Sequence, residues 1–115
     1  MIEDKLYGDK PEVRYYSTST ANMVIIPYDI TVHDNDYYSW RELDIKTKYF
    51  SYDGIVNLLI CRKYPSDKMQ AIINNYLLDP TDETALSEFN EMQEFRKTVK
   101  SIARQIMDNK EKGII

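Results

Sequence analysis

The longest alternation of apolar and other residues lies between Met23 and Val32. Apolar side chains occupy every second position there: Val24, Ile26, Tyr28, Ile30 and Val32. Successive side chains of a strand point to opposite faces, so this spacing predicts a long, half-buried β-strand with these five residues on one face. Pro27 has no N–H to donate to a ladder, and we expect it to mark an edge, a bulge or a bend.

Two neighbouring segments are predicted to pair with this strand. Residues 13–18 are rich in β-branched and aromatic side chains, and residues 37–49 place Leu43, Ile45, Thr47 and Tyr49 on one side. Polar stretches at 17–20 and 33–36 supply the turns. We therefore expect a three-stranded antiparallel β-meander that must be covered on one face to be stable.

The second half of the chain has the spacing of helices. A first helix is expected over 54–64, capped by Asp53 or Ser51 and stopped by Pro65. Ser66 is expected to cap a second helix over 67–77, and residues 79–82 form a turn and a further cap.

The last helix has the clearest pattern. Apolar residues recur at spacings of three and four: Ala85, Phe89, Met92, Phe95, Val99, Ile102 and Ile106. They form one stripe, and acidic residues precede basic ones along the helix, which suits its dipole. A helix of about 25 residues is nearly 40 Å long, which exceeds the diameter of about 30 Å expected for a domain of this size. Part of the stripe is therefore expected to meet another chain, and a homo-oligomer through this helix is one such arrangement.

These elements predict an α+β fold in a single domain. It comprises a loosely ordered arm (1–11), the β-meander (12–50), a helical region (51–109) and a tail (110–115). The length of 115 residues and the 43% apolar and 30% charged content are ordinary for one globular domain.

Composition narrows the choice of partners and of compartment. A net charge of −4 offers no general attraction for phosphate backbones, so nucleic acid is an unfavoured partner. The single cysteine, Cys61, allows no intramolecular disulfide. No apolar run is long enough to span a bilayer, and the first residues do not resemble a secretory signal. A cytoplasmic protein without a membrane partner is predicted.

Catalytic chemistry has little support in the sequence. His33 is the only histidine, so neither a metal site with Asp34 and Asp36 nor a dyad with Cys61 is favoured. The three glycines stand alone and form no phosphate-binding loop. We predict a protein that is not an enzyme, with no catalytic residue, cofactor or metal.

Aromatic residues are the one compositional excess, with ten tyrosines. Adjacent tyrosines on a strand must face opposite sides of the sheet, so one face is expected either to meet a partner or to be covered by the arm or a helix. The predicted partner-binding residues on the sheet are Tyr15, Tyr16, Tyr37, Tyr38 and Trp40. Those on the helix stripe are Phe89, Met92, Phe95 and Val99.

Three short motifs stand out in the helical half: Arg62-Lys63-Tyr64-Pro65-Ser66-Asp67, Ala71-Ile72-Ile73-Asn74-Asn75-Tyr76 and Phe95-Arg96-Lys97-Thr98-Val99-Lys100. Through these motifs residues 52–106 resemble small phage and prophage tail-assembly proteins, namely tail-fibre assembly proteins and tail chaperones. Phe95 stands where a tyrosine is expected, and the preceding tryptophan is missing. The resemblance implies a non-enzymatic assembly or accessory role.

Together these patterns predict a non-catalytic protein–protein interaction module. One alternative is a nucleic-acid-associated regulator that stacks bases on an aromatic sheet face. Another is a small enzyme of unknown type.

Overall fold

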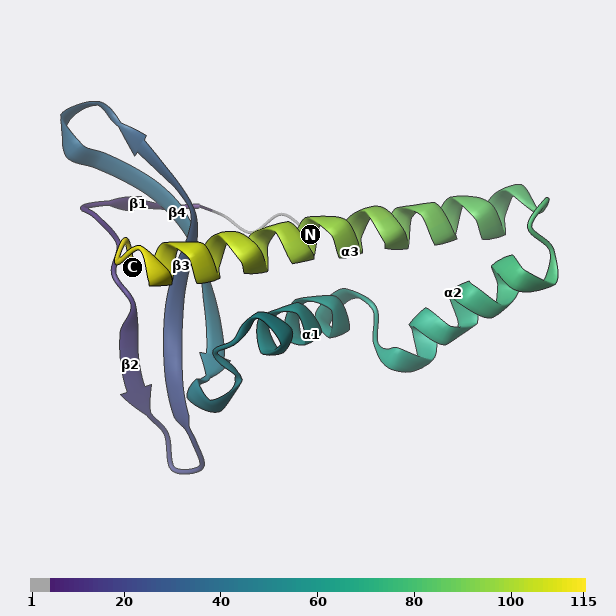
Figure 1. Cartoon of the computed structure of the whole chain (residues 1–115), viewed down its shortest axis with the longest axis horizontal. Coiled ribbons are helices and arrows are strands. Elements are labelled where there is room, and N and C mark those ends of the chain that lie inside the picture. The colour runs from purple at the N-terminus through teal and green to yellow at the C-terminus, as the bar shows by residue number, and fades with distance from the viewer. Residues whose placement is uncertain (1–4) are drawn as a thin grey trace. The chain divides into compact units, whose positions relative to one another are not determined.

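The computed structural model describes residues 5–115 and shows four strands followed by three helices (Figure 1). The strands are β1 (Leu6–Gly8), β2 (Arg14–Ser17), β3 (Asn22–His33) and β4 (Tyr37–Lys46). The helices are α1 (Tyr52–Lys63), α2 (Ser66–Leu78) and α3 (Glu83–Glu111), and short 3₁₀ turns, η1 (Asp34–Asp36) and η2 (Thr47–Tyr49), flank β4. The predicted α+β class, antiparallel sheet and three helices with a long last one are confirmed.

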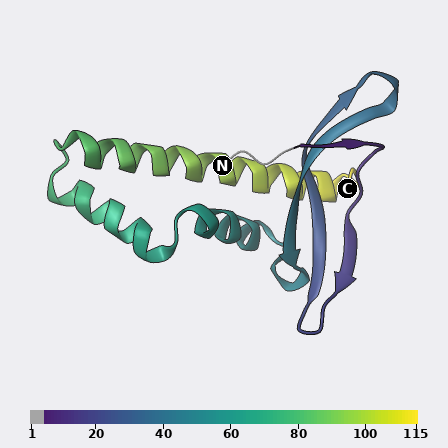
Figure 2. The same ribbon diagram turned by 180° about the vertical axis from the view of Figure 1, so that it is seen from behind.

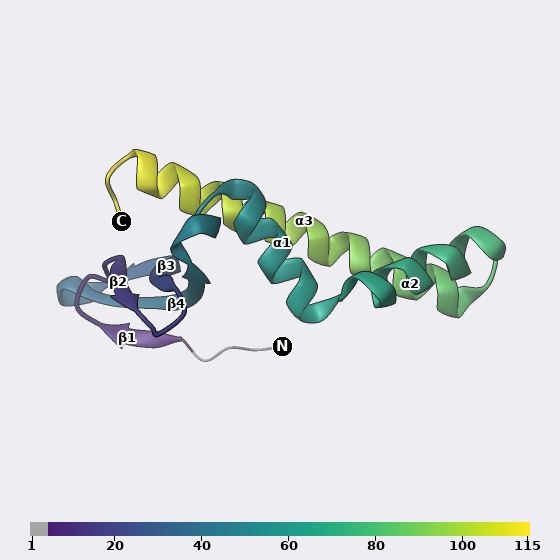
Figure 3. The same ribbon diagram turned by 90° about the horizontal axis from the view of Figure 1, so that it is seen from below.

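The sheet has four strands in the order β1-β4-β3-β2, so the prediction of a three-stranded meander is wrong. The additional strand, β1, comes from the segment predicted to be a loose arm. It pairs with the N-terminal half of β4, where Leu6 is opposite Trp40. Three residues are too few to show an alternating pattern, and their partners lie at least 30 positions away in the sequence. The sheet is curled (Figure 3).

β3 and β4 form a long hairpin (Figure 2). We call the half that contains the turn η1 the far half, and β1 pairs with it. The other half, which pairs with β2, is the near half. The ladder shifts between Tyr28 and Thr31, where two residues of β3 oppose one of β4. This is a β-bulge, and Asp29 adopts a left-handed backbone with φ 52°. Because of this extra residue, each β3 side chain beyond the bulge faces the side of the sheet opposite to the one that regular alternation would give it. Val32 therefore does not share a face with Tyr28 and is 65% exposed, which corrects the prediction of five residues on one face.

Contacts along the chain divide it into two compact units. One contains residues up to Ile55 together with Ile102–Ile115, and the other contains Val56–Ser101. The prediction of a single domain stays a prediction.

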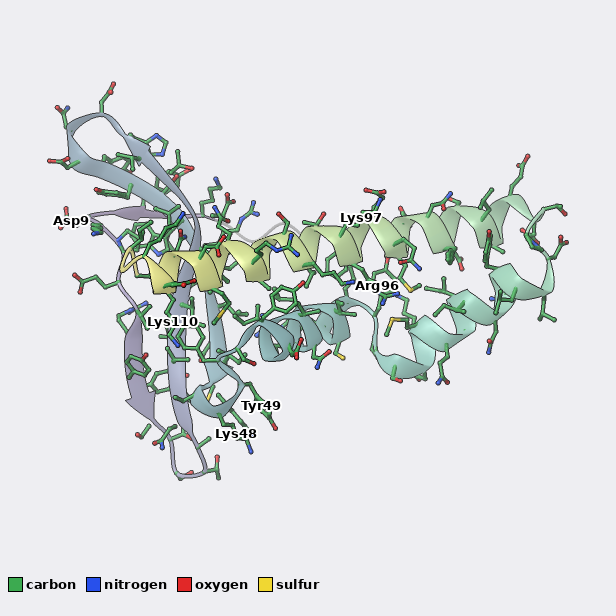
Figure 4. The ribbon with its side chains drawn as sticks, in the orientation of Figure 1. Asp9, Lys48, Tyr49, Arg96, Lys97 and Lys110 are labelled. Atoms are coloured by element: carbon green, nitrogen blue, oxygen red, sulfur yellow. The ribbon has the colours of Figure 1, made fainter. Side chains whose placement is uncertain are left out.

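The first unit has its core on one face of the sheet. Val24, Ile26, Leu43 and Ile45 are buried there, as are Ile55, Ala103 and Ile106. The C-terminal turns of α3 lie on one side of the sheet (Figure 3). At the same end, the Lys110 ammonium lies 4.3 Å from the centre of the Phe50 ring (Lys110 is labelled in Figure 4). We call the sheet face that bears Val24 and Leu43 the core face.

The second unit is held by aromatic contacts between its helices. The rings of Tyr76 and Phe89 stack with centroids 4.2 Å apart, and those of Tyr64 and Phe95 lie 5.6 Å apart. Met92 and Val99, which lie close to Phe89 and Phe95 in the sequence of α3, are buried.

Side chains close to the helix ends form the caps. The Ser51 hydroxyl accepts a hydrogen bond from the Gly54 N–H, and the Asp82 carboxylate accepts bonds from the N–H groups of Thr84 and Ala85. The predicted capping by Ser51 and in 79–82 is confirmed. Ser66 is not a cap: it is the first residue of α2, and Pro65 precedes it without a side-chain bond. Within the described residues, no helix has the length and apolarity needed to cross a membrane.

Candidate protein-binding surface on the hairpin

The ladder places the five predicted sheet aromatics on two faces. Residues directly opposite each other in an antiparallel pair share a face. Tyr15 is opposite Val24, and Tyr37 lies at even spacing from Leu43 in β4, so both belong to the core face. Tyr16, Tyr38 and Trp40 belong to the opposite face. The structure therefore does not gather the five residues into one site.

A compact aromatic cluster does occupy the far half of the hairpin. The rings of Tyr7 and Tyr37 stack at 5.9 Å with an angle of 16° between their planes, and the His33 ring lies 5.9 Å from Tyr37 and 6.4 Å from Tyr7. Tyr7 is 59% exposed and Tyr37 is 48% exposed. We call these three residues the aromatic cluster.

The bulge and β1 together create the cluster. β1 places Tyr7 opposite Ser39, and the hairpin places His33 opposite Tyr37. Without the one-residue shift at the bulge, His33 would point to the other face. The sequence gives Tyr37 as a candidate, whereas Tyr7 and His33 were missed, because neither the short strand nor the shift has a local signal.

Ser39 and His33 form a hydroxyl–imidazole pair beneath the cluster. The Ser39 Oγ and His33 Nε2 atoms are 2.8 Å apart. Such a distance is typical of a nucleophile and its base, but Ser39 is only 2% exposed, so a substrate cannot reach its hydroxyl. The imidazole satisfies a buried polar group, as buried hydroxyls require.

The opposite face of the far half is also apolar. Leu6 is 44% exposed and Val32 is exposed, while Tyr38 and Trp40 are half-buried. The Trp40 ring lies close to Gly8, since a Cβ added to Gly8 would be 3.6 Å from its Cη2 atom. The Trp40 indole N–H donates to the Glu42 carboxylate at 3.2 Å. Trp40 thus packs against other parts of the same sheet and is only half-buried.

The near half of that opposite face is occupied by polar contacts between β2 and β4. Arg14 reaches Glu42 at 2.6 Å, and the Tyr16 hydroxyl donates to Asp44 at 2.7 Å. The hydrogen bond to the Asp44 carboxylate raises the pKa of Tyr16. Tyr16 is therefore engaged within the sheet, and Tyr15, 65% exposed, stands apart on the edge strand.

Charges around the far half are unevenly distributed. The Asp29 carboxylate at the bulge lies 3.6 Å from the Lys5 ammonium and 3.5 Å from the Arg41 guanidinium. Both cations are therefore ion-paired with Asp29. Asp34 and Asp36 lie in η1, the turn that joins His33 to Tyr37, and both are exposed. The tip of the hairpin is therefore acidic.

The four predicted helix residues lie in the second unit and are largely covered. Met92 is fully buried and Val99 is 2% exposed, so neither offers a surface to a partner. Phe89 and Phe95 are half-buried in the ring contacts with Tyr76 and Tyr64. Amphipathic spacing cannot tell a stripe that meets another chain from one that meets its own α1 and α2.

A cleft of about 360 Å³ lies between α2 and α3 of the second unit. Its lining includes Tyr64, Lys68, Asn75, Glu88 and Glu91. Burial raises the pKa of the Tyr64 hydroxyl, and the nearby Glu91 and Glu88 carboxylates raise it further. The Lys68 ammonium lies 5.3 Å from the centre of the Tyr64 ring.

Other reactive groups do not assemble. Among residues 5–115, no three His, Cys, Asp or Glu side chains are grouped so that they could hold a metal ion. The Cys61 thiol is free and exposed on α1.

Comparison of this chain with protein-family models, curated proteins and solved structures gives no match. The resemblance to tail-assembly proteins stays a prediction.

Proposed function

We propose that this chain is a non-catalytic protein-binding module whose binding surface is the aromatic cluster of Tyr7, His33 and Tyr37. The observation that carries the proposal is the stacked pair of tyrosines, 59% and 48% exposed, on strands that are otherwise firmly paired. Tyrosines are enriched among the residues that dominate protein interfaces, because they bury a large area with few rotatable bonds.

A purely structural role for the stack is the competing interpretation. The Tyr7–Tyr37 contact could serve only to hold β1 against the hairpin. That role needs the faces that touch, whereas about half of each side chain remains in contact with water. Leu6 and Val32 on the reverse side add further exposed apolar area at the same end of the sheet, and a grouped apolar surface of this kind favours an interface.

The proposal includes no catalytic step. The one nucleophile–base pair at the cluster, Ser39 with His33, has its nucleophile buried. Hydrolysis of p-nitrophenyl acetate that disappears in Ser39→Ala would contradict this part of the proposal.

The resemblance of residues 52–106 supports a more specific role, as an accessory or assembly protein of a phage or mobile element acting in the cytoplasm. The single exposed thiol of Cys61 suits a reducing compartment. The predicted homo-oligomer through α3 is left out of this proposal, because Met92 and Val99 of its stripe are buried.

Base stacking on the cluster is disfavoured by its charges. Single-stranded nucleic acid needs cations along its phosphates, whereas Lys5 and Arg41 are paired with Asp29 and the tip carries Asp34 and Asp36. We expect no salt-sensitive shift of a labelled oligonucleotide by the purified protein.

A capture experiment tests the binding surface. Immobilised chain is compared with the double variant Tyr7→Ser/Tyr37→Ser and with Tyr15→Ser, which removes a tyrosine of similar exposure from the other end of the sheet. Proteins retained by the wild type and by Tyr15→Ser should be lost with the double variant, while circular dichroism stays unchanged. Equal retention by all three forms would exclude the cluster as the surface.

If the double variant unfolds, the milder Tyr37→Leu keeps an apolar side chain and removes the aromatic ring. Retention of the same proteins by folded Tyr37→Leu would likewise count against the cluster.

A further inference from the structure

We infer that the aromatic cluster recognises an arginine side chain on an extended or loop segment of the partner protein. The inference rests on the proposed function and adds the chemistry of the group that is bound. It follows from the tyrosine rings and from the two aspartates of the turn that joins His33 to Tyr37.

The rings supply a surface for a cation. A guanidinium is attracted to the face of a tyrosine ring and stacks on it, because the ring face is electron-rich and the guanidinium is planar. Tyr7 and Tyr37 are stacked on one another at 5.9 Å, so the faces directed away from the stack are the ones left for a ligand. Both side chains keep about half of their area exposed.

The turn supplies the opposite charge. Asp34 and Asp36 follow His33 and precede Tyr37, and among the described residues neither carboxylate has a hydrogen-bond or ion-pair partner. Lys5 and Arg41 of the neighbouring strands form their ion pairs with Asp29 instead. A guanidinium above the rings could donate forked hydrogen bonds to such a carboxylate, which an ammonium cannot do.

The backbone of the turn fixes where these carboxylates stand. Asn35 and Asp36 both adopt left-handed conformations, with φ 62° and 57°. Asn and Asp tolerate this region better than most residues. A tight turn of this type has few alternative conformations, so little ordering cost is added on binding.

A second copy of this chain fits the same surface poorly. Two clusters facing each other across a two-fold axis would bring two acidic turns together. Like charges at an interface disfavour that pairing. Charge complementarity therefore favours a basic segment of a different protein.

Peptide titration tests the inference. The probe is a blocked nonapeptide in which arginine alternates with glycine and serine, and the comparison peptides carry lysine or citrulline in place of arginine. Binding to the full chain is followed by NMR at the Tyr7, His33 and Tyr37 rings. We expect the arginine peptide to shift these signals, the lysine peptide to bind several-fold more weakly, and the neutral citrulline peptide not to bind.

Matched variants separate specific recognition from general attraction. Asp34→Asn/Asp36→Asn and Tyr37→Leu should each weaken the arginine peptide about tenfold. Asp67→Asn/Asp108→Asn removes the same charge at two exposed helix positions and should leave binding within about twofold. Equal weakening by both double variants, or equal binding of the lysine peptide, would overturn the inference.

The inference and the proposed function can fail separately. If the Tyr7→Ser/Tyr37→Ser variant loses the captured proteins but no peptide shifts the cluster, the surface stands and its arginine specificity is wrong. If the peptide shifts resonances elsewhere and not those of the cluster, the arginine site is refuted directly.

Discussion

Gly54 at the start of α1 is a position where only the smallest residue fits. A Cβ placed there would lie 2.1 Å from the Tyr49 carbonyl oxygen and 2.8 Å from its carbon. These are backbone atoms of η2, so they cannot rotate away as a flexible side chain would. The close approach is needed because the chain turns directly from η2 into the helix.

Gly54→Ala is therefore expected to lower the free energy of unfolding by about 2–4 kcal/mol. The measurement is urea unfolding followed by circular dichroism. Asn57→Ala, at an exposed position of the same helix, is the control and should change stability by less than about 0.5 kcal/mol. Equal stability of the two variants would show that η2 can move aside.

Asp79 is a second residue whose local contacts have a measurable consequence. Its carboxylate accepts hydrogen bonds from the Thr81 hydroxyl at 2.6 Å and from the Thr81 N–H at 3.1 Å. The hydroxyl bond is the largest cause that lowers the pKa of Asp79 below its ordinary value of 3.8, with the backbone bonds adding to it. A carboxyl with a lowered pKa stabilises the fold above its unfolded-state pKa and loses that contribution as the pH falls through the folded-state pKa.

Thr81→Val removes the hydroxyl and keeps the shape of the side chain. We expect the pKa of Asp79 to rise towards 3.8 in this variant, because the ionised form loses its first hydrogen-bond donor. An NMR titration of the carboxyl carbon between about pH 2 and 6 measures this shift. An unchanged pKa would mean that the backbone bonds alone set it.

At the scale of elements, the bulge in β3 decides what the hairpin presents. Before the bulge, the core face of β3 bears Val24, Ile26 and Tyr28. Beyond the bulge, the same face bears Thr31 and His33. Asp29 holds the bulge in two ways, through a left-handed backbone and through its contacts with Lys5 and Arg41.

Replacing Asp29 separates these two contributions. Asp29→Gly keeps the left-handed backbone accessible and loses only two partly exposed ion pairs, so a change below about 1 kcal/mol is expected. Asp29→Val adds a β-branched side chain at positive φ and should cost about 2 kcal/mol or more. Thermal unfolding of the two variants measures these costs, and a loss in Asp29→Gly as large as that in Asp29→Val would show that the ion pairs matter more than the backbone.

At the scale of the whole molecule, the apolar stripe of α3 determines how readily copies associate. Its buried members are Ala85, Met92, Val99 and Ile106, and its half-buried members are Phe89, Phe95 and Ile102. A stripe that is already covered leaves no continuous apolar strip on this helix for another copy.

We therefore expect a mass of 13.6 kDa, that of one chain, from light scattering at concentrations up to about 100 µM. A stable dimer would contradict this expectation. If Leu77→Ser/Leu78→Ser, which removes exposed leucines of α2, left such a dimer intact, these leucines would be excluded as its interface.

The sequence alone determined the features that depend on neighbours within a few positions. The alternation at Val24, Ile26 and Tyr28, the spacing of the α3 stripe, and the caps at Ser51 and Asp82 all follow from local periods or from side chains that bond to nearby backbone. The α+β class follows from these features.

Tertiary structure decided the rest, because it depends on pairs that are distant in the sequence. Tyr7 joins His33 and Tyr37 only when β1 pairs with β4, and His33 reaches that face only through the bulge at Asp29. Burial likewise separated Met92 and Val99, which are covered by the chain itself, from Tyr7 and Tyr37, which keep half of their surface in water. A periodic pattern shows that a side chain is apolar and on which side it lies, but the packing of the folded chain decides whether that side is covered.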